Sequence, residues 1–294
     1  METIRTILTG ISQIFLQRNT LSGALIAIGM YFSHPALCAA CLLGSLTGTL
    51  TARLMRFPEN EISQGLYGFN ASLAMMCILF TFGLNHTANP TVWLLGIFAA
   101  ALTVPIVSLF LRHNKPALTF PFVAICWIMY GLTTYYGLFG LTNNPSPLPE
   151  LTTTSSALSM PFYAWAEVNF GSSPLTGLLL LAAVAVNSPG SAMWATASAV
   201  FAASIAHILF GIEPNLLANG LYSYSAILIA CMFYGKRTTD FYYALTAVFL
   251  AVPIQYVTAA TGLPPYTFGF IAAVWIMLFI KKTIKQYTTA YQTT

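Results

Sequence analysis

Ten apolar runs follow one another along this chain of 294 residues and constrain its fold more than any other feature. They lie at about 21–33, 36–52, 71–84, 91–111, 120–140, 175–187, 192–211, 225–235, 241–257 and 268–280. Continuous apolar runs predict membrane helices, whereas strands of a membrane barrel alternate apolar and polar residues. Several runs are shorter than the roughly 20 residues of a full crossing, so we expect flanking residues or neighbouring helices to complete them. The sequence predicts an all-α integral membrane protein with about ten transmembrane helices.

The composition agrees, because 57% of the residues are hydrophobic and only 6% are charged. A soluble domain would carry roughly a quarter charged residues, so most of this surface is expected to face the lipid bilayer. The net charge of +4 is modest, and the basic residues stand in short clusters between apolar runs. Such clusters are typical of cytoplasmic loops and not of a nucleic-acid patch. We therefore exclude nucleic acid as a partner.

The basic residues also predict an orientation, since Lys and Arg prefer the cytoplasmic side of a membrane. When the N-terminus is placed in the cytoplasm and ten crossings are counted, all eleven basic residues fall on that side. They are Arg5, Arg18, Arg53, Arg56, Arg112, Lys115, Lys236, Arg237, Lys281, Lys282 and Lys285. Both termini are therefore expected in the cytoplasm, and the short ends are typical of a bacterial inner-membrane protein.

A polar stretch rich in Pro, Ser and Thr at 142–161 separates two similar halves, 1–141 and 162–294. Gly23 corresponds to Gly177 and Pro35 to Pro189, both 154 positions later (177 − 23 and 189 − 35). Further pairs follow in the same order: Gly65-Leu66-Tyr67 with Gly220-Leu221-Tyr222, Thr119-Phe120 with Thr267-Phe268, and Trp127 with Trp275. The chain is therefore interpreted as two copies of one unit joined by a connector.

Each copy holds five runs, an odd number, so the second copy must enter the membrane from the opposite face. This predicts inverted repeats with a central pore at their interface. The segments 62–69 and 216–224 are too polar for a crossing and too apolar for an open loop, and we interpret them as re-entrant half-helices. Their Gly65, Gly68 and Gly220 would permit close backbone approach, although packing glycines in ordinary loops would look the same.

The duplicated motifs resemble those of the urea transporters. Residues 65–70 (Gly-Leu-Tyr-Gly-Phe-Asn) are similar to the family's half-helix motif, residues 119–122 (Thr-Phe-Pro-Phe) to its later motif, and residues 19–23 (Asn-Thr-Leu-Ser-Gly) to its opening motif. The second copy offers residues 173–177, 220–225 and 267–270. It departs from the pattern with Ser223, Tyr224 and Ser225, and Leu16 stands where the family often has Phe. The resemblance spans nearly the whole chain.

This resemblance implies a homotrimeric channel with one pore per protomer, conducting urea down its gradient without a cofactor or a metal. A flat neutral solute rich in N–H donors needs apolar walls and a line of acceptors. The implied pore residues are Gln13, Leu16, Phe69, Leu73, Thr119, Glu167, Phe170, Tyr224, Leu228 and Thr267, and the half-helix motif residues are Gly65, Gly68, Asn70, Gly220 and Ser225. The aromatic residues could instead be packing residues, and the two threonines could bind carbonyls of their own helices.

Other functions remain to be weighed against this one. An ion- or proton-coupled secondary transporter for a short amide or ammonia shares inverted repeats and broken helices, but it should have more buried charge than Glu167 alone. An intramembrane enzyme would need a nucleophile with a base, or a metal site, and no such motif is present. Cys38 and Cys41 form a C-x-x-C without a second pair, so a metal role is not indicated.

Overall fold

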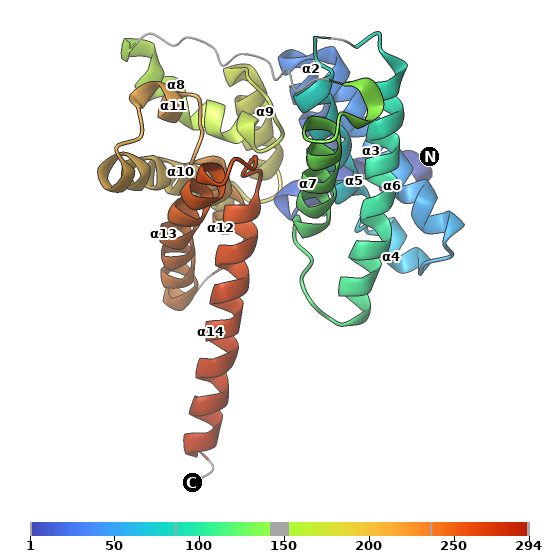
Figure 1. The fold of residues 1–294 in the computed structure, drawn as a ribbon. Coiled ribbons are helices and arrows are strands. Elements are labelled where there is room, and N and C mark those ends of the chain that lie inside the picture. The colour runs from blue at the N-terminus through green and yellow to red at the C-terminus, as the bar shows by residue number, and fades with distance from the viewer. Residues whose placement is uncertain (1, 86, 142–152, 236, 293–294) are drawn as a thin grey trace.

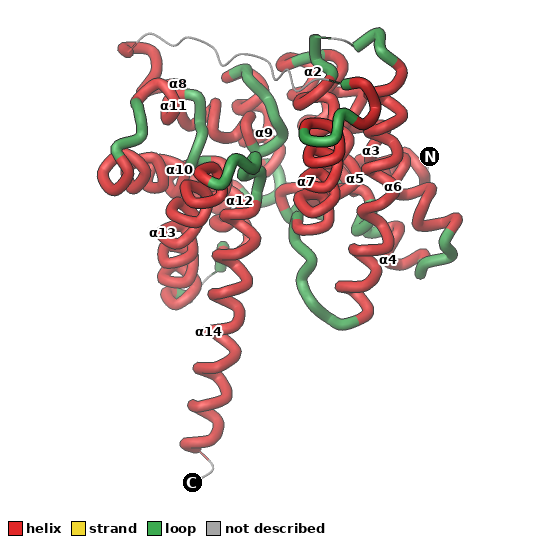
Figure 2. Tube along the Cα trace, in the orientation of Figure 1, coloured by secondary structure: helices red, strands yellow, loops and turns green. Residues whose placement is uncertain are grey.

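The structure, a computed structural model, describes residues 2–85, 87–141, 153–235 and 237–292. Within these ranges the fold is all helical, with loops and turns between the helices and no strand (Figure 2). The first half contains α1 (Glu2–Ser12), η1 (Gln13–Phe15), α2 (Thr20–Ser33), α3 (Pro35–Leu54), α4 (Glu59–Ser63), α5 (Gly68–Phe82), α6 (Pro90–Arg112), α7 (Phe120–Thr134) and η2 (Leu138–Gly140). The second half contains α8 (Thr153–Glu167), α9 (Pro174–Ala185), α10 (Pro189–Phe210), α11 (Pro214–Ala218), α12 (Tyr224–Phe233), α13 (Thr238–Ala260) and α14 (Phe268–Gln292).

Each of the ten apolar runs forms a helix, and the start sites follow from local sequence. Pro35 and Pro90 stand at the first positions of α3 and α6, where a missing backbone N–H costs nothing. The preceding His34 and Asn89 accept a hydrogen bond from a backbone N–H of the first turn. By length and hydropathy, α3, α6, α10 and α13 can cross a membrane, and the chain has the fold of an all-α membrane protein.

Besides the five-residue helices α4 and α11, two longer helices of the described residues lie outside the ten runs. These are α1, which is amphipathic, and α8, which begins with Thr and Ser. Neither is continuously apolar, so a search for apolar runs does not detect them. Since α8 begins at Thr153, the last nine positions of the predicted connector, 153–161, are helical; positions 142–152 lie outside the described ranges.

The structure does not have continuous half-helices at 62–69 and 216–224, where the sequence predicted them. Five-residue helices, α4 and α11, end at Ser63 and Ala218, and a turn follows each before α5 and α12 begin. Gly65 and Gly220 lie in these turns with φ of +76° and +81°, in the left-handed region that ends a right-handed helix. The motif residues Phe69 and Asn70 therefore belong to the first turn of α5.

The two halves lie side by side, with α1–α7 forming one group and α8–α14 the other (Figure 1). Helices α2 and α9 pack against each other at the interface. Ser22 donates to the carbonyl of Ala183 at 2.6 Å, and Thr176 donates to the carbonyl of Gly29 at 2.7 Å. Both donors and both acceptors are 154 positions apart (176 − 22 and 183 − 29), so the two contacts are reciprocal.

The recurring glycines Gly23 and Gly177 explain how each half packs its first two helices. A Cβ atom at Gly23 would lie 1.8 Å from the carbonyl oxygen of Leu8, and one at Gly177 would lie 1.7 Å from that of Phe162. No side chain fits there, so α1 can cross α2, and α8 can cross α9, only through glycine. The same sequence feature thus produces the same close crossing twice.

Candidate functional site

The threonines that precede the last helix of each half meet at the interface. Thr119 and Thr267 are buried, and their Oγ1 atoms are 2.6 Å apart in a hydrogen bond for which either can be the donor. They do not bind carbonyls of their own helices. After one bond between them, the pair still has a free O–H donor and several lone pairs, so it can accept a hydrogen bond from a passing N–H group.

Both threonines follow a residue with unusual backbone geometry. Leu118 has a φ of 51° and Tyr266 a φ of 41°, in the left-handed region that bulky side chains rarely adopt. Such a conformation persists only where the surroundings hold it in place. The carbonyls of these two residues are the anchoring points, because each accepts a hydrogen bond from a side chain of a motif helix.

In the first half the anchor is Asn70 of α5. Its Nδ2 donates to the carbonyl of Leu118 at 3.0 Å, and its Oδ1 accepts from the backbone N–H of Phe122 at 3.1 Å. Asn70 is fully buried, and both bonds bind the chain entering α7. Its amide therefore fixes the turn that carries Thr119.

The second half performs the same task with different residues. The hydroxyl of Tyr224 donates to the carbonyl of Tyr266 at 2.5 Å, while Ser225 donates to Oε1 of Gln255 at 3.2 Å. Tyr224 and Ser225 occupy the positions of Phe69 and Asn70 in the repeated motif. The phenol of Tyr224 thus replaces the Asn amide as the donor, which explains how the chain tolerates this departure from the family pattern.

Four of the predicted pore residues line one cavity of about 230 Å³: Glu167, Phe170, Tyr224 and Thr267. The cavity combines a carboxylate, hydroxyl groups and aromatic faces, and it is open enough to receive a small solute. No Lys or Arg is among its lining residues. It offers acceptors for N–H donors and apolar walls for a flat molecule.

Aromatic rings pack around Phe170 at this cavity. Its ring centroid lies 5.3 Å from that of Phe80, 6.1 Å from Phe122 and 6.2 Å from Tyr266. Phe170 has a φ of 63°, and the corresponding Leu16 has a φ of 59°, so both follow their first helix with the same turn. The aromatic cluster makes this part of the interface apolar.

The other predicted pore residues lie elsewhere. Nε2 of Gln13 donates to the carbonyl of Gln64 at 2.9 Å, Leu16 is 37% exposed, and Phe69 is half-buried. Leu73 and Leu228 are fully buried in the core, and none of these five lines the 230 Å³ cavity. Thr119 is connected to the cavity through its bond with Thr267.

The motif glycines allow a close approach to the first helix of each half. A Cβ atom at Gly65 would lie 2.4 Å from the backbone nitrogen of Gly10, and one at Gly220 would lie 2.4 Å from that of Ala164. Gly68 faces Ser45, whose Oγ would be 2.6 Å from an added Cβ. The turns before α5 and α12 therefore rest directly on α1 and α8.

Sequence reasoning missed several cavity residues, among them Phe80, Tyr222, Gln255 and Tyr266. Gln255 carried a usable signal, because an amide inside the apolar run 241–257 is costly in a membrane and so points to function. The aromatic residues carried none, since 14% of the chain is aromatic. Only their positions in space distinguish them from packing residues.

Apolar helices long enough to cross a bilayer, together with a cavity that has acceptors and aromatic walls, define a multi-pass membrane protein with a cavity of a size for a small solute. Within the described ranges, no three His, Cys, Asp or Glu side chains gather into a possible metal site. The profile of the urea transporter family matches residues 4–282, and the chain belongs to that family. It is therefore a transport protein and not an enzyme.

Individual relatives agree with this assignment. Urea transporter 1 of Capra hircus is 26% identical over 303 residues, covering 95% of this chain and 77% of the relative. Urea transporter 1 of Rattus norvegicus is 27% identical over 300 residues (93% and 76%), and that of Mus musculus is 29% identical over 304 residues (93% and 76%). The similarity thus extends over both halves of the chain.

Proposed function

We propose that this chain conducts urea passively across a membrane, along a path between its two halves. The observation that carries the proposal is the 230 Å³ cavity in which Glu167 and Thr267 offer acceptor oxygens beside Phe170 and Tyr224. Urea is flat, neutral and rich in N–H donors, so it pairs with oxygens at its edge and with aromatic walls at its faces. Membership of the urea transporter family gives the substrate.

The path is proposed to continue past the Thr119–Thr267 pair towards Gln13. At that end Leu16, Phe69 and Leu73 would form the walls, as Phe170, Tyr224 and Leu228 would at the other. The support is the correspondence between the halves, in which Gln13 matches Glu167 and Leu16 matches Phe170. Because Thr119 and Thr267 bind each other, the solute would pass beside the hydroxyl pair and exchange hydrogen bonds with it.

Ten crossings in two inverted repeats remain a proposal. Its support is the reciprocity of contacts between the halves, because a two-fold relation makes each contact occur twice with the roles exchanged. Trp127 donates to the carbonyl of Pro264, and Trp275 donates to that of Pro116. The corresponding positions are both 148 apart (275 − 127 and 264 − 116). The distribution of Lys and Arg supports cytoplasmic termini, and cysteine labelling from either side of sealed vesicles would test this.

A homotrimer in the inner membrane of a bacterium is likewise proposed from the family resemblance. Each protomer would hold its own path, so assembly would not be needed to form the pore. Light scattering of the detergent-solubilised protein, corrected for bound detergent, would measure the number of subunits directly. A monomeric mass with full urea flux would contradict the trimer without affecting the proposed path.

Coupled transport is the alternative, and no observation in the described ranges favours it. Glu167 is the only acidic side chain lining the cavity, and a coupled carrier needs groups that bind the driving ion. Family membership points to urea as the solute. An ion gradient would therefore be expected to leave the rate of transport unchanged.

The test is stopped-flow urea flux into proteoliposomes without an ion gradient, with thiourea and glycerol as comparison solutes. Glu167→Ala and Thr119→Val remove acceptors on the proposed path and should lower urea permeability at least tenfold. Glu213→Ala and Thr283→Val are matched controls, because neither residue lines the cavity. Urea flux that needs an ion or proton gradient would overturn passive conduction in favour of coupled transport.

A further inference from the structure

A second cavity, of about 550 Å³, lies at the start of the first half, beside α1 and the beginning of α2. Arg5 and Arg18 line it together with the hydroxyl-bearing Thr9, Thr20 and Ser63. The threonine hydroxyls are 3.4 Å apart, so the two helices meet at the cavity wall. The proposed urea path does not use any of these residues.

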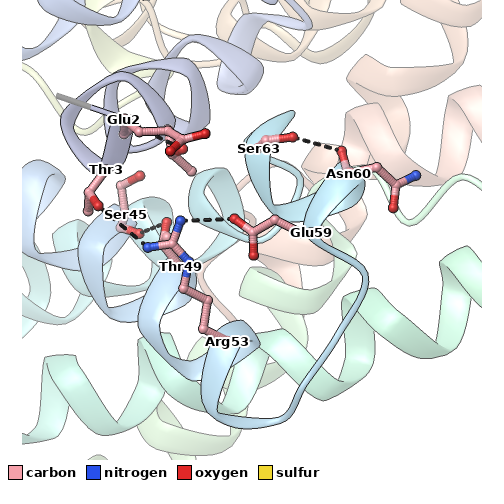
Figure 3. A network of polar contacts seen from close by, with 9 residues as sticks. Glu2, Thr3, Ser45, Thr49, Arg53, Glu59, Asn60 and Ser63 are labelled. Carbon is pink, nitrogen blue, oxygen red and sulfur yellow. Dashed lines mark hydrogen bonds and ion pairs between the residues drawn. The ribbon is translucent and has the colours of Figure 1, made fainter.

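The two arginines in this cavity carry uncompensated charge. Nearby, Arg53 forms an ion pair with Glu59 at 2.9 Å, as Figure 3 shows beside Glu2 and Ser63. Among the described residues, no acidic group lies within ion-pair distance of Arg5 or Arg18. Glu2 is the only acidic residue lining the cavity, so the lining side chains leave a net positive charge.

This charge is not required by the architecture of the repeat. At the corresponding positions of the second half, 154 residues later, Ser159 replaces Arg5 and Ser172 replaces Arg18. A cavity also exists there, beside Met160 and Ala218, and no Lys or Arg lines it. The cavity near α8 in the second half therefore lacks the guanidinium groups that line the cavity beside α1.

An apolar strip leads away from the basic cavity. Leu21 directly follows the cavity residue Thr20 and is 56% exposed, and Ile28, two turns further along the same face of α2, is 51% exposed. Ile4, next to Arg5, is also exposed. A ligand that fits this surface has an anionic head for the guanidinium groups and an apolar tail for the strip.

We propose that this cavity binds an anionic glycerophospholipid, with the headgroup phosphate between Arg5 and Arg18 and an acyl chain along Leu21 and Ile28. Guanidinium and phosphate form charge-assisted hydrogen bonds, and basic pockets between membrane helices on the cytoplasmic side attract anionic headgroups. Because Thr9 and Thr20 share one hydrogen bond, one of their two hydroxyls remains free to donate to a further headgroup oxygen. This site is independent of urea conduction.

The experiment titrates the full chain, purified in a neutral detergent, with phosphatidylglycerol or phosphatidylcholine and counts bound lipids by native mass spectrometry. Arg5→Gln/Arg18→Gln should weaken phosphatidylglycerol binding roughly thirtyfold and leave phosphatidylcholine binding unchanged. The control Arg56→Gln/Lys115→Gln removes the same charge from the predicted cytoplasmic side and should retain binding. Glu2→Gln removes the competing carboxylate and should tighten binding several-fold, which loss of folding cannot do.

Three outcomes would overturn the proposal. The first is equal phosphatidylglycerol binding by the Arg5→Gln/Arg18→Gln variant and the unchanged protein. The second is an equal loss in the control variant, which would indicate attraction to net charge and no defined site. The third is displacement of phosphatidylglycerol by millimolar inorganic phosphate, which would assign the cavity to a free anion.

Discussion

The indole Nε1 of Trp127 donates a hydrogen bond to the carbonyl oxygen of Pro264, 2.8 Å away in the other half of the chain. Trp275 makes the reciprocal bond to Pro116 at 3.0 Å, and each indole also contacts a phenyl ring of the opposite half. The two halves are thus joined by a matched pair of contacts. In each half the accepting proline precedes the bonded threonine, Thr119 or Thr267, and the donating tryptophan follows it.

Replacing Trp127 by Phe should lower the free energy of unfolding by about 1–3 kcal/mol, because the partly buried carbonyl of Pro264 loses its donor. The change is measured as a shift in thermal unfolding in detergent. Trp93→Phe is the control, since its indole binds the carbonyl of Thr87 in an exposed local loop. An equal effect of both substitutions would contradict the role of Trp127 in joining the halves.

Gly220→Ala should destabilise the protein far more than Gly262→Ala. Both glycines have a φ near +80°, so both alanines carry a similar backbone strain of about 1–2 kcal/mol. A Cβ at Gly220 would also lie 2.4 Å from the nitrogen of Ala164, whereas nothing lies within 4 Å at Gly262. The difference between the two variants in the shift of the thermal unfolding midpoint measures the cost of the close approach at Gly220. Equal shifts would show that the close approach has no cost.

Tyr224→Phe should lower stability by about 1–3 kcal/mol, because the buried carbonyl of Tyr266 loses its hydroxyl donor. In the first half the same carbonyl position is bound by an amide, that of Asn70. The double substitution Tyr224→Phe/Ser225→Asn copies that arrangement and should recover much of the loss. If unfolding of the double variant is no better than that of Tyr224→Phe, the two anchors are not equivalent.

Thr119→Val and Thr267→Val should each reduce urea permeability, and their effects should not add. Each substitution removes the same hydrogen bond. The fold-loss of urea permeability in the double variant should therefore be closer to that of either single variant than to the product of the two single losses. A loss of about tenfold is expected for one hydrogen bond to the transition state, from roughly 1.4 kcal/mol. Stopped-flow flux measures this; Thr119→Ser, which keeps the hydroxyl, should retain most activity. Fully multiplicative losses would show that the threonines act separately.

Much of the helical architecture could be predicted from the sequence, since each of the ten apolar runs forms a helix. The exceptions have physical causes. Helices α1 and α8 are not continuously apolar, so hydropathy does not detect them. The segments after α4 and α11 are turns, because Gly65 and Gly220 adopt a backbone that a helix cannot contain.

The candidate site was predicted less completely. Glu167, Phe170, Tyr224 and Thr267 share a cavity, yet Leu73 and Leu228 are buried in the core. Residue type cannot separate these cases, because a leucine at a motif position suits a pore wall and a packed interior equally well. Gln255 could have been noticed as a buried amide, but its partner Ser225 lies 30 positions away.

The sequence by itself determined that the chain is an apolar, helical membrane protein, and it predicted the duplication, because apolar composition and ordered recurring motifs can be recognised without contacts between distant residues. The tertiary structure decided which residues meet. The bond between Thr119 and Thr267 joins positions 148 apart, and the Tyr224 hydroxyl reaches the carbonyl of Tyr266 across 42 positions. A hydrogen bond requires its atoms to be about 3 Å apart in a set direction, and only the packing of both halves brings them there.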